Sequence, residues 1–180
     1  MRIGALSWIG YVYLFSVRRK MPRKCGKGKA IFSPCLQLIH TLVKGNYQAV
    51  MAQFDRDLFE KLSPPGAGVD LVRFDGSKKG DVVHIRLKLF GFITQDWISD
   101  ITDDGVTDEE AFFIDQGSTL PFFLTFWKHR HVVKIVGGDQ SEIIDDIQFQ
   151  TPWWIPGFLM YPIMWAQFAY RKPIYRKYFG

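Results

Sequence analysis

Two histidines and an aspartate are the residues best suited to chemistry in this sequence. In the segment 123–136, Trp127, His129 and His131 fall on one side of an extended strand, because successive strand residues point to opposite faces. The basic residues between them occupy the other side, which must therefore face water. In the next segment Asp145 alternates with apolar residues and shares their inward side. The pattern predicts an Asp–His cluster on the inner face of a sheet.

An aspartate beside a buried histidine has three roles open to it. Buried polar groups cost roughly 1–3 kcal/mol each unless they are hydrogen-bonded, so the simplest role is a satisfied structural network. A few convergent polar groups in an apolar pocket also anchor ligands. The third role is catalytic, with His129 or His131 as general base and Asp145 orienting the imidazole. The sequence contains no Gly-x-Ser-x-Gly elbow, phosphate loop or dinucleotide fingerprint that would support catalysis.

The sequence predicts neither a metal nor a cofactor. Two histidines on one strand supply two ligands, whereas a zinc site normally has three or four. Cys25 and Cys35 lack the Cys-x-x-Cys spacing of metal and redox sites. A run of carboxylates does not follow the spacing of a calcium-binding EF-hand loop, so we interpret it as solvated turn chemistry. The run comprises Asp100, Asp103, Asp104, Asp108, Glu109 and Glu110.

Composition and charge favour a single folded domain and give no sign of a nucleic-acid binder. The chain has 180 residues, of which 47% are hydrophobic, and this fits one folded domain. The net charge is +5, but much of the basic excess lies at 18–29 and 171–177. Nucleic-acid binders usually place Lys and Arg along one continuous face, so we expect no nucleic-acid partner. The cysteine usage makes a reducing cytoplasm the simplest location.

An apolar run from Ile3 to Val17, followed by basic residues, sets the start of the chain apart. A membrane-spanning helix needs about 20 apolar residues, and a secretory signal carries its charges before the run. Three interpretations stay open: a membrane-touching anchor, a helix packed on the domain, or translation that starts at Met21. We favour the last. The chain is therefore divided into an extension over 1–29 and a domain over 30–180.

Alternating and β-branched segments predict seven strands. Asp-Gly and Gly-Gly-Asp sequences between them are hairpin chemistry, because Gly and Asp tolerate the positive φ of tight turns. These turns are expected at Asp75-Gly76, Asp104-Gly105 and Gly137-Gly138-Asp139. Consecutive hairpins imply an antiparallel meander. The predicted strands are Ile31–Val43, Val69–Phe74, Asp81–Phe90, Ile93–Ile101, Glu109–Gln116, Phe123–Val136 and Glu142–Gln150.

Two further segments predict helices. Apolar residues at three- and four-residue spacing indicate an amphipathic helix from Tyr47 to Leu62, which a Ser-Pro-Pro-Gly sequence ends. The dense aromatic segment 153–179 predicts a long C-terminal helix that Pro162 and Pro173 kink or break. A strand, a helix, a meander and a long helix in this order indicate an α+β domain.

This order of elements, with eight local strings, resembles the START-like helix-grip superfamily (SRPBCC), which includes the birch-pollen allergen and lipid-transfer domains. The strings follow a bacterial branch of that superfamily from Ile31 to the end of the chain. They are Phe54-Asp55-Arg56-Asp57-Leu58-Phe59, Pro64-Pro65-Gly66, Arg73-Phe74-Asp75-Gly76, Gly80-Asp81, Pro121-Phe122, Trp127-Lys128-His129-Arg130-His131, Ile144-Asp145-Asp146 and Phe168-Ala169-Tyr170-Arg171. The resemblance implies a curved antiparallel sheet wrapped around the C-terminal helix, with a cavity between them.

In relatives such a cavity takes lipids, sterols, polyketides or plant hormones, and some relatives are cyclases or aromatases. We therefore expect a non-catalytic binder of a hydrophobic small molecule or lipid. A cyclase- or hydrolase-type enzyme and an interaction module with a self-filled core are the alternatives. Peripheral membrane contact is a further variant, because the C-terminal helix is apolar nearly all round. The expected lining is Val83, Ile85, Leu87, Phe113, Trp127, Phe158 and Trp165, with His129, His131 and Asp145 at the polar end.

Overall fold

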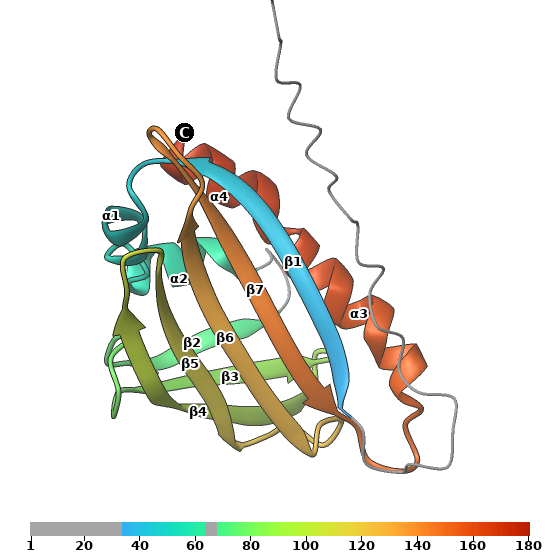
Figure 1. The fold of residues 1–180 in the computed structure, drawn as a ribbon. Helices are drawn as coiled ribbons and strands as arrows, with labels where there is room; N and C mark the ends of the chain where they lie inside the picture. The colour runs from blue at the N-terminus through green and yellow to red at the C-terminus, as the bar shows by residue number, and fades with distance from the viewer. Residues whose placement is uncertain (1–33, 64–67) are drawn as a thin grey trace, which may run out of the picture.

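A computed structural model of the protein describes residues 34–63 and 68–180. These residues form one sheet of seven antiparallel strands and four helices (Figure 1). The strands are β1 (Cys35–Lys44), β2 (Val69–Phe74), β3 (Val82–Leu89), β4 (Ile93–Val106), β5 (Glu110–Thr119), β6 (Phe126–Ile135) and β7 (Gln140–Gln150). The helices are α1 (Tyr47–Met51), α2 (Arg56–Leu62), α3 (Gly157–Ala169) and α4 (Arg171–Phe179). The predicted α+β class is confirmed.

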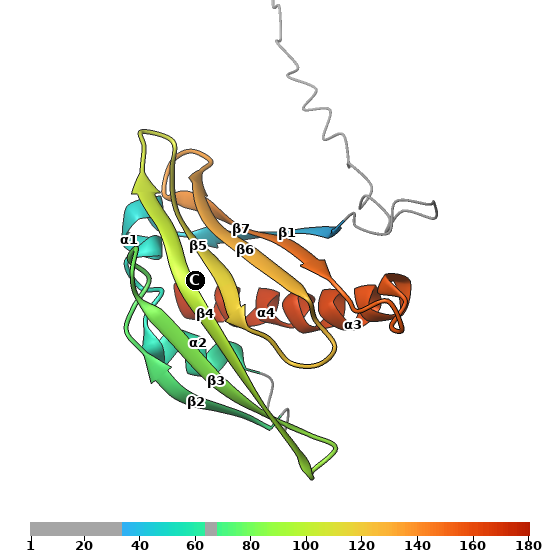
Figure 2. The same cartoon turned by 90° about the horizontal axis from the view of Figure 1, so that it is seen from below.

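The sheet is a meander with the first strand added at its far edge. Strands β2 to β7 follow one another, and β1 pairs with β7 along its whole length, from Cys35 opposite Phe149 to Lys44 opposite Gln140. Buried and less buried residues alternate along β1 and β7, so one face of the sheet is covered, and most of the side chains on that face are apolar. Figure 2 shows the sheet curving around α3 and α4, which lie inside its arc. The curved sheet around a C-terminal helix is therefore as expected.

The helix predicted from Tyr47 to Leu62 is two helices. Its apolar stripe is real, since Val50 and Leu58 are both buried. The backbone nevertheless leaves the helix before Asp55, whose carboxylate caps α2 by accepting a hydrogen bond of 2.9 Å from Leu58 N. Such a cap competes with helix continuation, and an apolar stripe does not reveal it.

The predicted C-terminal helix is also two helices, joined at Tyr170. Pro173 lies in the first turn of α4, where its missing N–H is not needed, but its ring would clash with the carbonyl four residues earlier in a continuous helix. Pro162 lies inside α3 without ending it. The predicted break is therefore present near Pro173 and absent at Pro162.

One predicted turn is wrong and another is confirmed. Asp104-Gly105 lies inside β4, and the chain reverses after it, where the Thr107 hydroxyl accepts hydrogen bonds from Glu109 N (3.3 Å) and Glu110 N (3.1 Å). This side-chain turn replaces the Asp-Gly turn that the sequence suggests. Gly137 and Gly138, with φ of 135° and 59°, form the predicted turn between β6 and β7.

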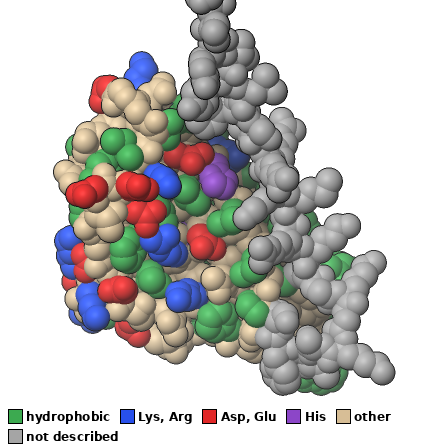
Figure 3. All heavy atoms as spheres, viewed as in Figure 1, with side chains coloured by type: hydrophobic (Ala, Val, Ile, Leu, Met, Phe, Trp, Pro, Cys, Tyr) green, Lys and Arg blue, Asp and Glu red, His purple; other side chains and the backbone are tan. Residues whose placement is uncertain are grey.

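The outer face of the sheet mixes charges of both signs. Figure 3 shows acidic and basic side chains interspersed over β1, β6 and β7, and the basic side chains form no continuous stripe on the face in view. A typical pair is Arg130 with Glu110, whose charged atoms lie 2.5 Å apart.

The extension over 1–29 and the apolar run within it lie outside the described residues. The boundary between 29 and 30 and the Pro64-Pro65-Gly66 string lie outside them as well. Within 34–63 and 68–180, no helix has both the length and the hydropathy needed to cross a membrane.

Candidate ligand-binding site

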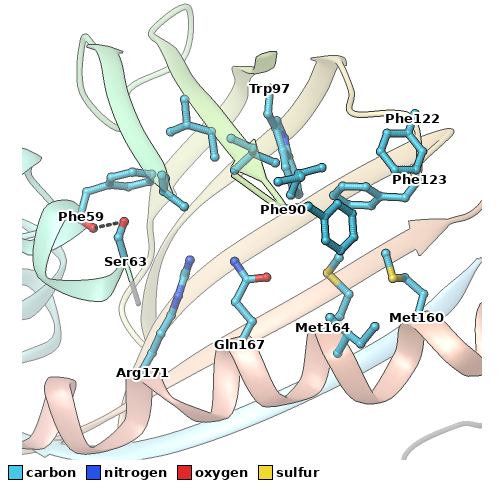
Figure 4. Close-up of a pocket in the computed structure, with 15 residues that line it drawn as sticks. Phe59, Ser63, Phe90, Trp97, Phe122, Phe123, Met160, Met164, Gln167 and Arg171 are labelled. Carbon is cyan, nitrogen blue, oxygen red and sulfur yellow. Dashed lines mark hydrogen bonds between the residues drawn. The ribbon is translucent and has the colours of Figure 1, made fainter. Parts of the chain in front are cut away.

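A chamber of about 480 Å³ lies between α3 and the strands β2 to β4 (Figure 4). Most of its lining is aliphatic, aromatic or thioether, and ligand pockets of this size and character bury drug-sized apolar molecules. The lining residues are Phe59, Ser63, Val69, Ile85, Leu87, Leu89, Phe90, Trp97, Phe122, Phe123, Met160, Ile163, Met164, Gln167 and Arg171.

Helices α3 and α4 present one row of side chains to this chamber. Met160, Met164, Gln167 and Arg171 recur at intervals of three and four residues, which is the repeat of one helix face. Figure 4 shows Gln167 and Arg171 rising from the helices toward the chamber. The row therefore changes from thioether to amide to guanidinium along the chamber.

A smaller hollow of about 70 Å³ adjoins the polar end of this row. Its walls bring together side chains from β4, β5 and β6 with the two polar residues of the helices. The polar members are Ser99, Asp115, His129, His131, Gln167 and Arg171. A third hollow, of about 40 Å³, lies toward α2. Phe59 and Arg171 line all three spaces, so these two side chains stand where the chamber meets the two smaller hollows.

The predicted Asp–His contact is present inside the sheet. A hydrogen bond of 3.0 Å joins His129 Nε2 to Asp145 Oδ1, and both side chains are almost fully buried. His131 Nδ1 lies 3.7 Å from the same oxygen and has no hydrogen-bond partner. The two imidazole rings lie with their centroids 3.6 Å apart. One histidine is therefore held in place by the carboxylate, while the other keeps an unpaired nitrogen.

Burial governs the protonation of this cluster. It lowers the pKa of His129 and of His131 well below the ordinary value, and the Arg171 charge acts in the same direction on both. Burial also raises the pKa of Asp145, against the opposing influence of His131 and Arg171. Both imidazoles are neutral at physiological pH, so each offers one N–H and one lone pair.

Asp115 is a site residue that sequence reasoning missed. It lies opposite His129 in the β5–β6 register, and its Oδ1 accepts a hydrogen bond of 3.0 Å from Trp127 Nε1. Burial raises its pKa to about 6, although the Ser99 hydroxyl, the Trp127 indole and the Arg171 charge act to lower it. Alternation along β5 places Asp115 on the face of Phe113, so the rule that found the histidines could have found it.

Asp115 also supplies the third donor that a metal site would need. One donor atom each from Asp115, His129 and His131 lie within 4.8 Å of one another. Two histidines are therefore not the only potential ligands here. However, the Arg171 guanidinium lines the same hollow and repels a cation, and Trp127 already occupies one Asp115 oxygen. We assign no metal to this cluster.

The predicted lining residues divide into four groups. Ile85 and Leu87 line the chamber, and Val83, Phe113, Trp127, His129 and His131 line the smaller hollows. Asp145 lies behind His129 and lines none of the three spaces. Phe158 and Trp165 line none of the three spaces and are 64% and 51% exposed. These two are seven residues apart on the side of α3 away from the row of Met160 and Met164.

Comparisons with known proteins show what this architecture is similar to. No protein-family model matches the chain, and no curated protein matches its sequence. Among solved structures, a START superfamily protein from Mycobacterium smegmatis matches with 12% identity and a TM-score of 0.52, over 78% of this chain and 96% of that one. The major latex-like protein 151 of Panax ginseng matches with 14% identity and a TM-score of 0.52, over 80% and 99%.

A third similar structure is an enzyme. Norcoclaurine synthase from Thalictrum flavum, solved in complex with dopamine and hydroxybenzaldehyde, matches with 16% identity and a TM-score of 0.51, over 81% of this chain and 90% of that one. Likeness at this level of identity establishes the arrangement of the elements and leaves activity open. The chain has the helix-grip fold of the START-like proteins.

Proposed function

We propose that this protein binds a hydrophobic small molecule of lipid type in the chamber between α3 and the sheet, without transforming it. The observation that carries the proposal is the chamber itself, about 480 Å³ of space with an apolar lining. Burying an apolar ligand there is favourable by roughly 25 cal/mol for each Å² of apolar surface removed from water.

The side chains around the chamber suit a ligand of variable shape. Met160 and Met164 are unbranched and polarizable, so they adapt to different apolar surfaces. Phe90, 79% exposed at the turn between β3 and β4, and Phe122, stacked on Trp154 with centroids 6.0 Å apart, stand at the rim. Exposed aromatic side chains at a rim favour transfer of an apolar ligand from another apolar surface, such as a membrane or a carrier.

Catalysis is the second candidate, and Asp115 is the observation that favours it. A carboxyl group with a pKa of about 6 is suited to proton transfer near neutral pH, and Asp115 faces the same hollow as His131. A bound compound recovered chemically unchanged after long incubation counts against this candidate. A new product that requires Asp115 supports it.

Thermal unfolding with a panel of ligands tests the proposed function. Tetradecanol, cholesterol and naphthol represent chain, sterol and aromatic ligands, and glycerol serves as a polar control. A ligand at about 100 times its Kd stabilises the folded state by about 2.7 kcal/mol, which raises the Tm by several degrees. We expect at least one apolar ligand to do so and glycerol to have no effect. An unchanged Tm with every apolar compound would contradict the proposal.

A further inference from the structure

Arg171 is a half-buried cation that no carboxylate of the described residues contacts. Its Nε is buried and has no hydrogen-bond partner, and no carboxylate of the described chain forms an ion pair with it. Its guanidinium lies over the Phe168 ring at 4.2 Å, which covers one of its faces but uses none of its N–H donors. The Tyr175 hydroxyl is a hydrogen-bonding neighbour of the guanidinium, but it is neutral. A guanidinium carries five donors and is costly to bury without a counterion, so Arg171 still lacks the anionic acceptor that would balance its charge.

The position of Arg171 shows where that acceptor belongs. Arg171 lines both the chamber and the polar hollow, and Gln167, one turn earlier, lines the same two spaces. Figure 4 shows Gln167 between Arg171 and Met164, and Arg171 on the side of the chamber away from Phe122 and Phe123. The lining therefore becomes more polar along the helices toward Arg171.

We infer that Arg171, assisted by the Gln167 amide, binds the carboxylate head of an amphipathic ligand whose apolar chain fills the chamber. The inference rests on the proposed function and names the class of ligand. A planar guanidinium matches a carboxylate with two parallel N–H···O bonds, and the neighbouring amide adds a further donor. Ligand binding then supplies the anionic acceptor that the described residues do not place in contact with Arg171.

The length of the chamber sets the length of the chain. Arg171 and Met160 are eleven residues apart on consecutive helices, which corresponds to roughly 16 Å at 1.5 Å per residue. An extended acyl chain of this length has on the order of a dozen methylenes, given carbon–carbon bonds of about 1.5 Å. Tetradecanoic acid is the matching probe, and tetradecanol is its uncharged counterpart.

The inference also predicts that removing the negative charge of Asp115 strengthens binding of the acid. The Asp115 carboxylate faces the hollow that Arg171 lines, together with His129 and His131 from β6, and like charges repel. Replacing Asp115 with Asn removes this negative charge and retains an oxygen as acceptor for the Trp127 indole. Asp115→Asn should therefore strengthen binding of the acid, whereas Arg171→Gln should weaken it. Neither change should alter the affinity for the alcohol by a comparable factor.

The experiment is calorimetric titration of the full chain with tetradecanoic acid and with tetradecanol. In Arg171→Gln the affinity for the acid should fall about 10- to 100-fold, the usual effect of losing a charge-assisted hydrogen bond, and the affinity for the alcohol should stay within about 3-fold. The affinity of Arg171→Lys for the acid should lie between those of wild type and Arg171→Gln, because lysine keeps the positive charge but cannot donate two parallel hydrogen bonds to the carboxylate. Arg176→Gln, an exposed change on the same helix, is the matched control.

The ratio of the two affinities within each protein separates this inference from the proposed function and from misfolding. A ratio of acid to alcohol affinity that falls in Arg171→Gln and rises in Asp115→Asn supports the inference. A ratio that is unchanged in both variants overturns it and leaves the proposed function standing. If wild type binds neither compound, the proposed function fails for chain-like ligands and the inference fails with it.

Discussion

The double substitution Val69→Trp/Leu87→Trp is expected to weaken the binding of tetradecanol by about 100-fold. Both residues line the chamber, on β2 and β3, and the indoles would occupy the space that an apolar chain needs. Displacing three or four methylenes from an apolar environment costs about 3 kcal/mol, at roughly 0.8 kcal/mol for each, and this corresponds to about 100-fold in Kd. The measurement is calorimetric titration of the variant and of the wild type.

Val72→Trp is the matched control for this prediction, because Val72 is on the same strand but 46% exposed. It should bind tetradecanol as wild type does. The free energy of unfolding adds a second criterion, since tryptophan placed into empty space is tolerated and tryptophan forced into a filled core costs about 1–3 kcal/mol. Unchanged affinity in the double variant, together with a marked loss of stability, would mean that the chamber is filled by its own side chains.

The substitution Asp115→Asn is expected to stabilise the protein at neutral pH and to flatten its pH dependence. Burial raises the pKa of Asp115 from 3.8 to about 6 in the folded state. Between about pH 4 and 6 the unfolded chain binds fewer protons at this carboxyl than the folded chain does, so the free energy of unfolding falls as the pH rises. This fall is complete above about pH 6, and it lowers the free energy of unfolding by at most about 3 kcal/mol in total.

Urea unfolding of wild type and Asp115→Asn at about pH 5 and pH 8 measures this effect. The free energy of unfolding of the variant minus that of the wild type should be about 1.5 kcal/mol larger at about pH 8 than at about pH 5. The difference is smaller than about 3 kcal/mol because part of the wild type's loss of stability occurs below about pH 5. Taking the difference between the two proteins removes the contributions of other titrating groups, such as Asp145. The exposed Asp103→Asn on β4 is the control. An advantage that is the same at both pH values is incompatible with an elevated pKa at Asp115.

The strands could be predicted from the sequence because a curved sheet with one apolar face imposes strict alternation. Val69–Phe74 matches β2 at both ends, β3 is one residue shorter than predicted at each end, and β7 begins two residues earlier than predicted and ends at the predicted residue. The helix ends were less predictable, since they depend on local hydrogen bonds such as the Asp55 cap. The pairing of β1 with β7 joins segments about a hundred residues apart, and no local pattern encodes it.

The polar end of the site was predictable in part. Alternation placed His129 and Asp145 on the inner face, and the same rule applied to β5 would have added Asp115. Arg171 could not be found in this way, because it belongs to a basic stretch at the end of the chain and such residues normally face water. Its burial depends on how α4 packs inside the sheet. Phe158 and Trp165 line none of the three spaces, and an aromatic residue on a helix does not reveal which side of the helix meets the sheet.

Native mass spectrometry of the wild-type protein, before and after adding tetradecanol or tetradecanoic acid, tests the existence of a binding chamber most directly. We expect the protein from cells to carry a small apolar compound, which organic extraction releases and identifies, or to take up one equivalent of an added probe. The Val69→Trp/Leu87→Trp variant, measured in parallel, should show neither. A wild-type mass equal to that of the bare chain, with no uptake of fatty acids, alcohols or sterols, would contradict the account and favour a self-filled core.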